Sequence, residues 1–187
     1  MSYAGELGWE IHMPNAACRD VYAALWAAGE AHGIADYGSF AMNAMRMEKG
    51  FKGAGELTNE VTLAEADVLR FARREKTFLG SDKTFNDELP WICAYLEIEP
   101  DGVADGHGGE AVVMDGRIVG STASVAYGPT VGKILAFAYI KPEAAAPGTV
   151  LDVIIHGKVR AAMVLGAPAY DPQSHLPRVD VAHEAAE

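Results

Sequence analysis

Residues 111–121 read Ala-Val-Val-Met-Asp-Gly-Arg-Ile-Val-Gly-Ser, and this stretch decides the fold of the C-terminal half of the chain. Two short apolar runs flank the dipeptide Asp115-Gly116. A two-residue hairpin turn of type I′ needs a positive φ at both central residues, and Asp-Gly adopts this conformation at little cost. The stretch therefore predicts a β-hairpin.

Other apolar runs of strand length surround this hairpin from Leu89 onwards, separated by Pro and Gly. His156-Gly157 predicts a second tight hairpin. Short strands of this number close most economically as a small barrel or sandwich. The six predicted strands are Trp91–Ile98, Ala111–Met114, Arg117–Ala126, Ile134–Ile140, Val150–His156 and Lys158–Leu165.

The N-terminal half has mainly helical spacing. Asn15 is a capping residue, and the helix predicted after it continues to Gly33. A second predicted helix covers Ser39–Glu48, with Gly50 as its stop, and a third covers Leu63–Arg74. The apolar stripe of the first helix comprises Val21, Ala24, Leu25 and Ala28, and that of the second Phe40, Ala44 and Met47.

One strand is expected before these helices. Residues 9–13 alternate apolar and polar side chains, which is typical of a half-buried strand, and Pro14 ends the run. Gly5 and Gly8 precede it and predict a loop.

Composition and charge exclude several classes of function. The chain has 187 residues, of which 50% are hydrophobic and 22% charged, so a packed fold is expected. A net charge of −11 argues against nucleic acid, whose phosphates require a basic face. The one basic run, which includes Arg70, Arg73, Arg74 and Lys76, reads as a solvated face or as a patch for an acidic ligand tail.

The sequence also suggests a location. Cys18 and Cys93 form no C-x-x-C pair, so we expect reduced, buried thiols in a cytoplasmic protein. No apolar run is long enough for a membrane helix. The six histidines are scattered without nearby ligands at metal-binding spacing, so no metal site is predicted.

Two stretches carry the remaining polar chemistry. Residues 3–10 read Tyr-Ala-Gly-Glu-Leu-Gly-Trp-Glu, and residues 45–51 read Met-Arg-Met-Glu-Lys-Gly-Phe. The first resembles the Y-x-G-E-x-G-[FW]-E segment of the glycine-cleavage T-protein superfamily of aminomethyltransferases. The second resembles the L-R-L-E-x-G helix end of the same family, and both lie in the family's order and spacing.

The resemblance extends over about residues 2–172. The wording of both motifs is closest to the folate domain of flavin-dependent sarcosine and dimethylglycine dehydrogenases. Where the family reads T-P-L-E-A-G-L, this chain has Thr-Leu-Ala-Glu-Ala-Asp-Val at 62–68, without the proline and the glycine. The further collinear matches are Glu56-Leu57-Thr58, Phe78-Leu79-Gly80, residues 115–121, Pro147-Gly148 and residues 168–172.

The resemblance implies an α+β fold: a partial ferredoxin-like folate-binding region, then a small six-stranded antiparallel β-barrel. We expect residues 1–88 to be the C-terminal portion of the folate-binding aminomethyltransferase domain, 89–177 the C-terminal barrel domain and 178–187 a disordered tail. If the two halves of such a fold interleave, residues 2–88 expose apolar edges, which predicts dimerisation or rearrangement.

The cofactor implied by the resemblance is tetrahydrofolate. A carboxylate accepts the amine edge of a pterin in bidentate fashion, and by motif position that carboxylate is Glu10; alternatively Glu10 faces solvent. Tyr3 is the candidate for a polar contact near the reacting nitrogen, or else packs in a turn. Glu6 is a weaker candidate. Arg46 complements the helix dipole, holds the folate glutamate or braces Glu48.

The function implied is transfer of a one-carbon unit from a small amine donor to tetrahydrofolate. The family's catalytic aspartate lies in the N-terminal half, so no catalytic residue is assigned in this chain, which alone is expected to be inactive. The alternatives are a non-catalytic folate-binding or scaffolding module of a flavin-dependent amine dehydrogenase, and a folate-dependent demethylase. The partners expected are folate, the amine donor, a flavoprotein domain and a second copy of the chain, but neither nucleic acid nor membrane.

Overall fold

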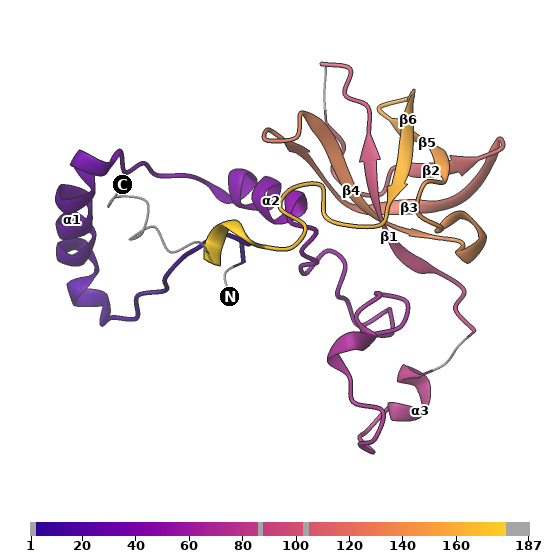
Figure 1. The fold of residues 1–187 in the computed structure, drawn as a ribbon, viewed down its shortest axis with the longest axis horizontal. Helices are drawn as coiled ribbons and strands as arrows, with labels where there is room; N and C mark the ends of the chain where they lie inside the picture. Colours follow the sequence, from indigo (N-terminus) through magenta and orange to yellow (C-terminus); the bar gives the residue numbers. More distant parts are fainter. Residues whose placement is uncertain (1–2, 86–87, 103–104, 179–187) are drawn as a thin grey trace.

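The computed structural model describes residues 3–85, 88–102 and 105–178. Figure 1 shows a β-barrel at one end of the molecule and helix α1 at the other, with helix α2 between them. Within the described residues, no helix is long and apolar enough to cross a membrane.

The barrel contains six antiparallel strands in the closed order β1-β4-β3-β2-β5-β6. β1 pairs with β4 on one side and with β6 on the other, so the sheet has no free edge along the paired residues. The strands are β1 Ile92–Ile98, β2 Ala111–Met114, β3 Arg117–Gly128, β4 Lys133–Ile140, β5 Val150–Ile155 and β6 Lys158–Leu165. The predicted six-stranded antiparallel barrel is therefore confirmed, with strand bounds that differ by at most two residues.

Both predicted tight turns have the conformation that their residues favour. φ is +51° at Asp115 and +73° at Gly116, and it is +49° at His156 and +76° at Gly157. Two successive positive φ values are those of a type I′ turn. These turns join β2 to β3 and β5 to β6.

The interior of the barrel is the main hydrophobic core. Leu96 and Ile98 from β1 and Ile140 from β4 have no exposed surface, and Val153 and Ile155 from β5 are equally buried. Inward and outward side chains alternate on β6, whose buried residues are separated by exposed ones. The core is thus supplied by the strands themselves.

The first helix forms but remains uncovered. A 3-10 turn, Asn15–Ala17, leads into α1, Cys18–Gly29, and a second 3-10 turn, Glu30–His32, ends at Gly33 with φ +72°. Asn15 does not occupy the predicted capping position: it is the first residue of the 3-10 turn, whose N-cap is Pro14, and the N-cap of α1 is Ala17. None of the α1 residues is buried, so its apolar stripe is uncovered in this structure, and the expected burial of Cys18 is wrong.

The second helix agrees with its prediction. α2 spans Ser39–Glu48, and Gly50 follows with φ +66°. Its C-terminal turn packs on β3 and β4, so Met47 is completely buried. Phe40 lies on the first turn, which projects beyond the barrel, and its side chain is 86% exposed.

Two predicted elements of the N-terminal half are absent. Residues 9–13 form no strand, and Trp9 is 81% exposed, because no described segment pairs with this run. Between Leu63 and Arg74 only a 3-10 turn, Leu69–Phe71, is helical, and a short helix α3, Ser81–Thr84, follows. Residues 3–85 as described contain no strand, so the ferredoxin-like sheet is not formed there.

The third helix fails for a local reason. Asp67 adopts φ +53°, the left-handed conformation, which interrupts a right-handed helix. The Glu65 carbonyl accepts a hydrogen bond of 2.7 Å from the amide of Cys93 at the start of β1. The segment is therefore a series of turns fastened to the barrel.

The described part of the chain ends beyond the barrel with a 3-10 turn, Leu176–Arg178. Of the predicted tail at 178–187, residues 179–187 lie outside the described residues.

Candidate functional site

The C-terminal end of α2 is the junction of the molecule, where the N-terminal stretch, the barrel and the C-terminal segment meet. Arg46, Glu48 and Lys49 are at most 4% exposed. Charged side chains are almost never this buried unless they are paired. Their partners define the candidate site.

Arg46 is held by three neighbours. Its Nε donates to the Asn43 side chain at 2.9 Å, and its Nη1 donates to the Phe51 carbonyl at 2.8 Å and to Glu56 Oε2 at 3.1 Å. The Glu56 side chain is fully buried and also accepts the Gly53 amide at 2.6 Å. Arg46 therefore braces Glu56, and not Glu48 as one of the sequence interpretations had it.

Glu48 binds backbone amides of the barrel. Its Oε1 accepts the backbone amides of Thr130 at 2.7 Å and Val131 at 3.3 Å, in the turn between β3 and β4. The Glu48 carbonyl accepts the amide of Tyr170 at 3.0 Å. Glu48 thus ties α2 to both the barrel and the segment that follows it.

Lys49 joins the two ends of the described chain. Its Nζ lies 2.6 Å from Asp171 Oδ2, 3.4 Å from Glu6 Oε1 and 4.8 Å from the centre of the Tyr170 ring. Burial lowers the pKa of Lys49, but the hydrogen bond to Asp171 and the charge of Glu6 outweigh it, so the pKa lies above its ordinary value. The ammonium group therefore stays charged.

Two tyrosines fasten this junction to the barrel. The Tyr95 hydroxyl on β1 donates to the Met47 carbonyl at 2.6 Å, and the Tyr139 hydroxyl on β4 donates to the Glu56 carbonyl at 2.7 Å. Burial raises the pKa of both hydroxyls, so both remain protonated donors.

The predicted site residues fall into two groups. Tyr3, Glu6 and Arg46 are brought together: a Cβ on Gly53 would lie 3.0 Å from the Tyr3 hydroxyl and 3.4 Å from Arg46 Cζ, and Glu6 pairs with Lys49. Glu10 lies apart from them. Its side chain is 91% exposed and lies 3.7 Å from His12.

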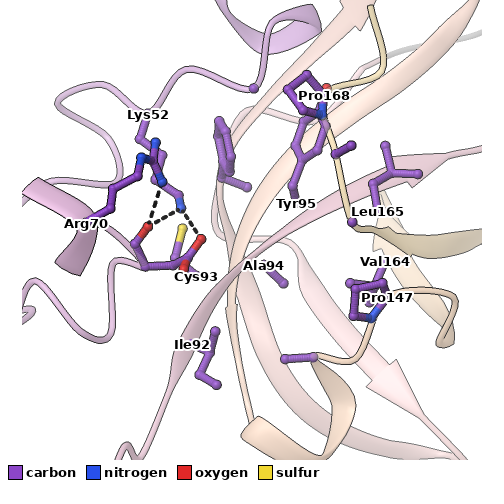
Figure 2. A pocket seen from close by; sticks show the side chains of 16 residues that line it. Lys52, Arg70, Ile92, Cys93, Ala94, Tyr95, Pro147, Val164, Leu165 and Pro168 are labelled. Carbon is purple, nitrogen blue, oxygen red and sulfur yellow. Dashed lines mark hydrogen bonds and ion pairs between the residues drawn. The ribbon is translucent and has the colours of Figure 1, made fainter. Parts of the chain in front are cut away.

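A cavity of about 390 Å³ opens beside the junction, between residues 50–70 and the barrel. Figure 2 shows Lys52 and Arg70 on one side of it and Tyr95, Leu165 and Pro168 on the other. Cys93 lines it too, and burial raises the pKa of this thiol to about 12. The thiol is therefore unreactive at neutral pH.

Sequence reasoning missed several of these residues. Lys49 and Glu56 stand within the motifs that the sequence analysis quoted, but no local pattern shows that they pair with Asp171 and Arg46. The tyrosines Tyr95 and Tyr139 read only as strand residues. The one available signal was the position of Lys49, a charged residue directly after a helix with an apolar face.

Comparison with protein families gives two adjacent matches. Residues 1–76 match the model of the GCVT N-terminal domain, and residues 93–171 match the glycine cleavage T-protein C-terminal barrel domain. The second match runs from Cys93, the second residue of β1, through β6 and ends at Asp171.

Individual proteins agree with these matches. Mouse mitochondrial dimethylglycine dehydrogenase is 32% identical over 90% of this chain, which spans 20% of that protein. A probable aminomethyltransferase of Thermococcus kodakarensis is 28% identical over 92% of this chain, which spans 50% of it. The chain thus spans half or less of these relatives.

A solved structure has the same fold. The glycine cleavage system aminomethyltransferase T of Bartonella henselae superposes with a TM-score of 0.80 and 22% identity, over 91% of this chain and 48% of that one. Because two domain models of one family match in order and cover most of its residues, the chain belongs to the glycine cleavage T-protein family.

Proposed function

We propose that this chain is the C-terminal part of a tetrahydrofolate-dependent, aminomethyltransferase-like protein, which transfers a one-carbon unit from a small amine donor to tetrahydrofolate. One observation carries the proposal: residues 3–6 of the first motif meet the second motif, residues 45–51, although the two are far apart in sequence. A Cβ on Gly5 would lie 2.5 Å from Lys49 Cγ, so the turn of the first stretch rests directly on the end of α2.

The residues present suit a folate. Glu10 projects its carboxylate into solvent, where His12 lies 3.7 Å away. Its oxygens are accessible to the amino group and ring N–H of a pterin. Tyr3 is half-exposed beside Gly53, where the lack of a side chain leaves room for the hydroxyl. Bound tetrahydrofolate supplies the nucleophilic nitrogen that receives the one-carbon unit.

The chain's own residues then position this cofactor. We assign the pterin to Glu10 and a polar contact to Tyr3. Glu6 holds the turn between them through Lys49. Arg46 acts on the site through Glu56 and the Phe51 carbonyl, since its donors are directed at these groups.

The exposure of residues 7–11 favours a contribution from further polypeptide. Leu7, Trp9 and Ile11 are 60%, 81% and 53% exposed, so nothing in the described structure walls off a pterin there. A water-excluding site therefore needs a second surface, either the part of the T-protein fold that this chain does not span or a second copy of the chain. In this proposal the C-terminal portion of the folate-binding domain comprises residues 1–88, and the barrel domain comprises residues 89–177.

A second candidate is a non-catalytic folate-binding or scaffolding module of a flavin-dependent amine dehydrogenase. The similarity to dimethylglycine dehydrogenase, of which this chain corresponds to 20%, favours it. Two unpaired thiols, Cys18 and Cys93, suit a cytoplasmic location for either candidate.

Calorimetric titration with reduced tetrahydrofolate tests the proposal. We expect saturable binding that Glu10→Gln weakens by about tenfold, the value of one hydrogen bond to a charged group. Glu30→Gln, a change of an exposed residue beyond α1, serves as the control and should bind like the original protein. Equal affinities of both variants would remove Glu10 from the site, and a folded protein without binding heat would show that this chain does not hold folate by itself.

A further inference from the structure

The cavity beside the junction is separate from the residues assigned to folate. Its wall includes Lys52, Asp67 and Arg70, whereas Tyr3, Glu6, Glu10 and Arg46 do not line it. Its volume of about 390 Å³ lies within the range of roughly 300–1,000 Å³ for small-molecule sites. The cavity is therefore large enough for a compact ligand.

The barrel side of the cavity is apolar. Ile92, Ala94 and Phe137 come from β1 and β4, and Leu165 and Pro168 from the end of β6 and the segment after it. Tyr95 adds a ring that is tilted against Phe137 at 5.1 Å. A flat apolar body would bury its faces against these side chains.

The opposite side carries an excess of positive charge. Lys52 is 12% exposed, and its Nζ lies 3.1 Å from Asp67 Oδ2 and 5.7 Å from the centre of the Phe137 ring. Arg70 donates to the Asp67 carbonyl at 3.5 Å. Two cations therefore face the cavity together with one carboxylate.

That carboxylate belongs to a residue in the left-handed conformation. Asp67 adopts φ +53°, a conformation uncommon outside glycine, and stands where the resembling motif T-P-L-E-A-G-L has its glycine. Its side chain is 69% exposed, although its partner Lys52 is largely buried. Because the Asp67 carboxylate faces water, solvent screens the pair, which is then worth about 1 kcal/mol, and a ligand carboxylate can displace Asp67 from Lys52.

Covalent chemistry is not expected here. The Cys93 thiol, with its pKa raised to about 12 by burial, is protonated at neutral pH. The Tyr95 hydroxyl is already committed to the Met47 carbonyl. The lining is equipped to bind, and not to attack, a ligand.

We propose that this cavity is a binding site for a small carboxylate with a flat apolar body. Lys52 binds the carboxylate, with Arg70 beside it. Phe137 and the apolar wall bury the body of the ligand. Asp67 competes with the ligand carboxylate for Lys52. The proposed occupant is a separate small molecule and not a part of folate.

Benzoate is the probe, and its uncharged analogue benzamide is the matched control ligand. Binding is followed through the NMR signals of the Phe137 ring and the Leu165 methyl groups. We expect saturable shifts with benzoate and at least about tenfold weaker binding of benzamide. Lys52→Met should weaken benzoate by a similar factor, whereas Lys158→Met, which removes an exposed lysine on the far hairpin, should not.

The variant Asp67→Gly gives the most direct test. Glycine adopts the same φ readily, and the substitution removes the carboxylate that pairs with Lys52. Benzoate should bind about fivefold more tightly to this variant, the value of a surface ion pair. The absence of saturable shifts in both the original protein and Asp67→Gly would overturn the proposal, as would unchanged binding in Lys52→Met. Displacement of benzoate by tetrahydrofolate, weakened by Glu10→Gln, would instead show that the cavity is part of the folate site.

Discussion

The barrel and helix α1 are both regular secondary structure, but they differ in what stabilises them. In the barrel, each strand pairs on both sides and the core is built from its own residues, among them Leu96 and Ile98 with no exposed surface. On α1, no residue is buried, and Tyr22, Leu25 and Trp26 are at least 38% exposed. A closed sheet satisfies its own backbone and core, whereas an amphipathic helix gains stability only from what packs on it.

The junction at the end of α2 lies between these extremes. Its helix is short, but its last turn is fixed by buried charges and by hydroxyls that the barrel supplies. Stability should therefore decrease from the barrel through the junction to α1.

The two cysteines, one in each region, should differ most. Cys18 is exposed on α1, whereas Cys93 is buried in β1 with a pKa raised to about 12. At pH 8 only about one Cys93 thiol in ten thousand is a thiolate, the reactive form. Iodoacetamide should therefore modify Cys18 at least about 1,000-fold faster, as measured by mass spectrometry of peptides, and comparable rates would show that β1 opens readily.

At the junction, Glu56→Ala should destabilise the protein by about 3–5 kcal/mol, because it leaves the Arg46 guanidinium buried without its counter-charge. Glu60→Ala, a change of an exposed glutamate four residues away, should cost less than about 0.5 kcal/mol. Urea denaturation followed by tyrosine and tryptophan fluorescence measures both. Equal midpoints for the two variants would mean that the Arg46–Glu56 pair does not hold the junction.

A matched pair of leucines compares the two regions directly. Leu96→Ala removes a side chain with no exposed surface from the barrel core and should cost about 3 kcal/mol. Leu25→Ala removes a side chain that is 46% exposed on α1, and alanine favours helix, so the cost should stay below about 0.5 kcal/mol. A large cost for Leu25→Ala in urea denaturation would show that α1 is covered in solution.

A smaller effect is expected from the ion pair that links the chain ends. The hydrogen bond from Lys49 lowers the pKa of Asp171 below its ordinary 3.8. Its stabilising effect is therefore complete above pH 4 and is lost as the pH falls through the lowered value. The difference in urea midpoint between the original protein and Asp171→Asn should be present at pH 7 and 5 and should shrink at pH 3.

Asp152→Asn on β5, where the side chain is exposed, is the control for this series. Its midpoint should differ little from that of the original protein at all three pH values. A difference for Asp171→Asn that stays constant down to pH 3 would contradict the role of the carboxylate charge.

The predictability of the fold follows the same gradient. Asp115-Gly116 and the strands around it were predicted correctly, because turn chemistry and alternation act between neighbours in sequence. The third helix was not, since Asp67 takes a left-handed conformation that interrupts the helix and that the helical spacing of its neighbours does not reveal. The strand at 9–13 was predicted from a genuine alternation, but a strand also needs a neighbour, which sequence pattern cannot supply.

The candidate site was predictable only in part. The motifs indicated Tyr3, Glu6 and Arg46, which do meet at the end of α2. The pairing of Lys49 with Asp171 joins residues 122 positions apart, and no local pattern contains it. The role of Glu10 stays a prediction, because its side chain faces solvent in the described structure.

Native-state hydrogen exchange tests the difference between the two regions most directly. In a sample dilute enough to sediment as a monomer, peptides from β4, residues 133–140, should exchange at least about 100-fold more slowly than peptides from α1, residues 18–29. That result would show that the barrel is stable by itself, whereas α1 is not covered by any other part of the monomer. Equal protection of α1 and β4 in the monomer would contradict it.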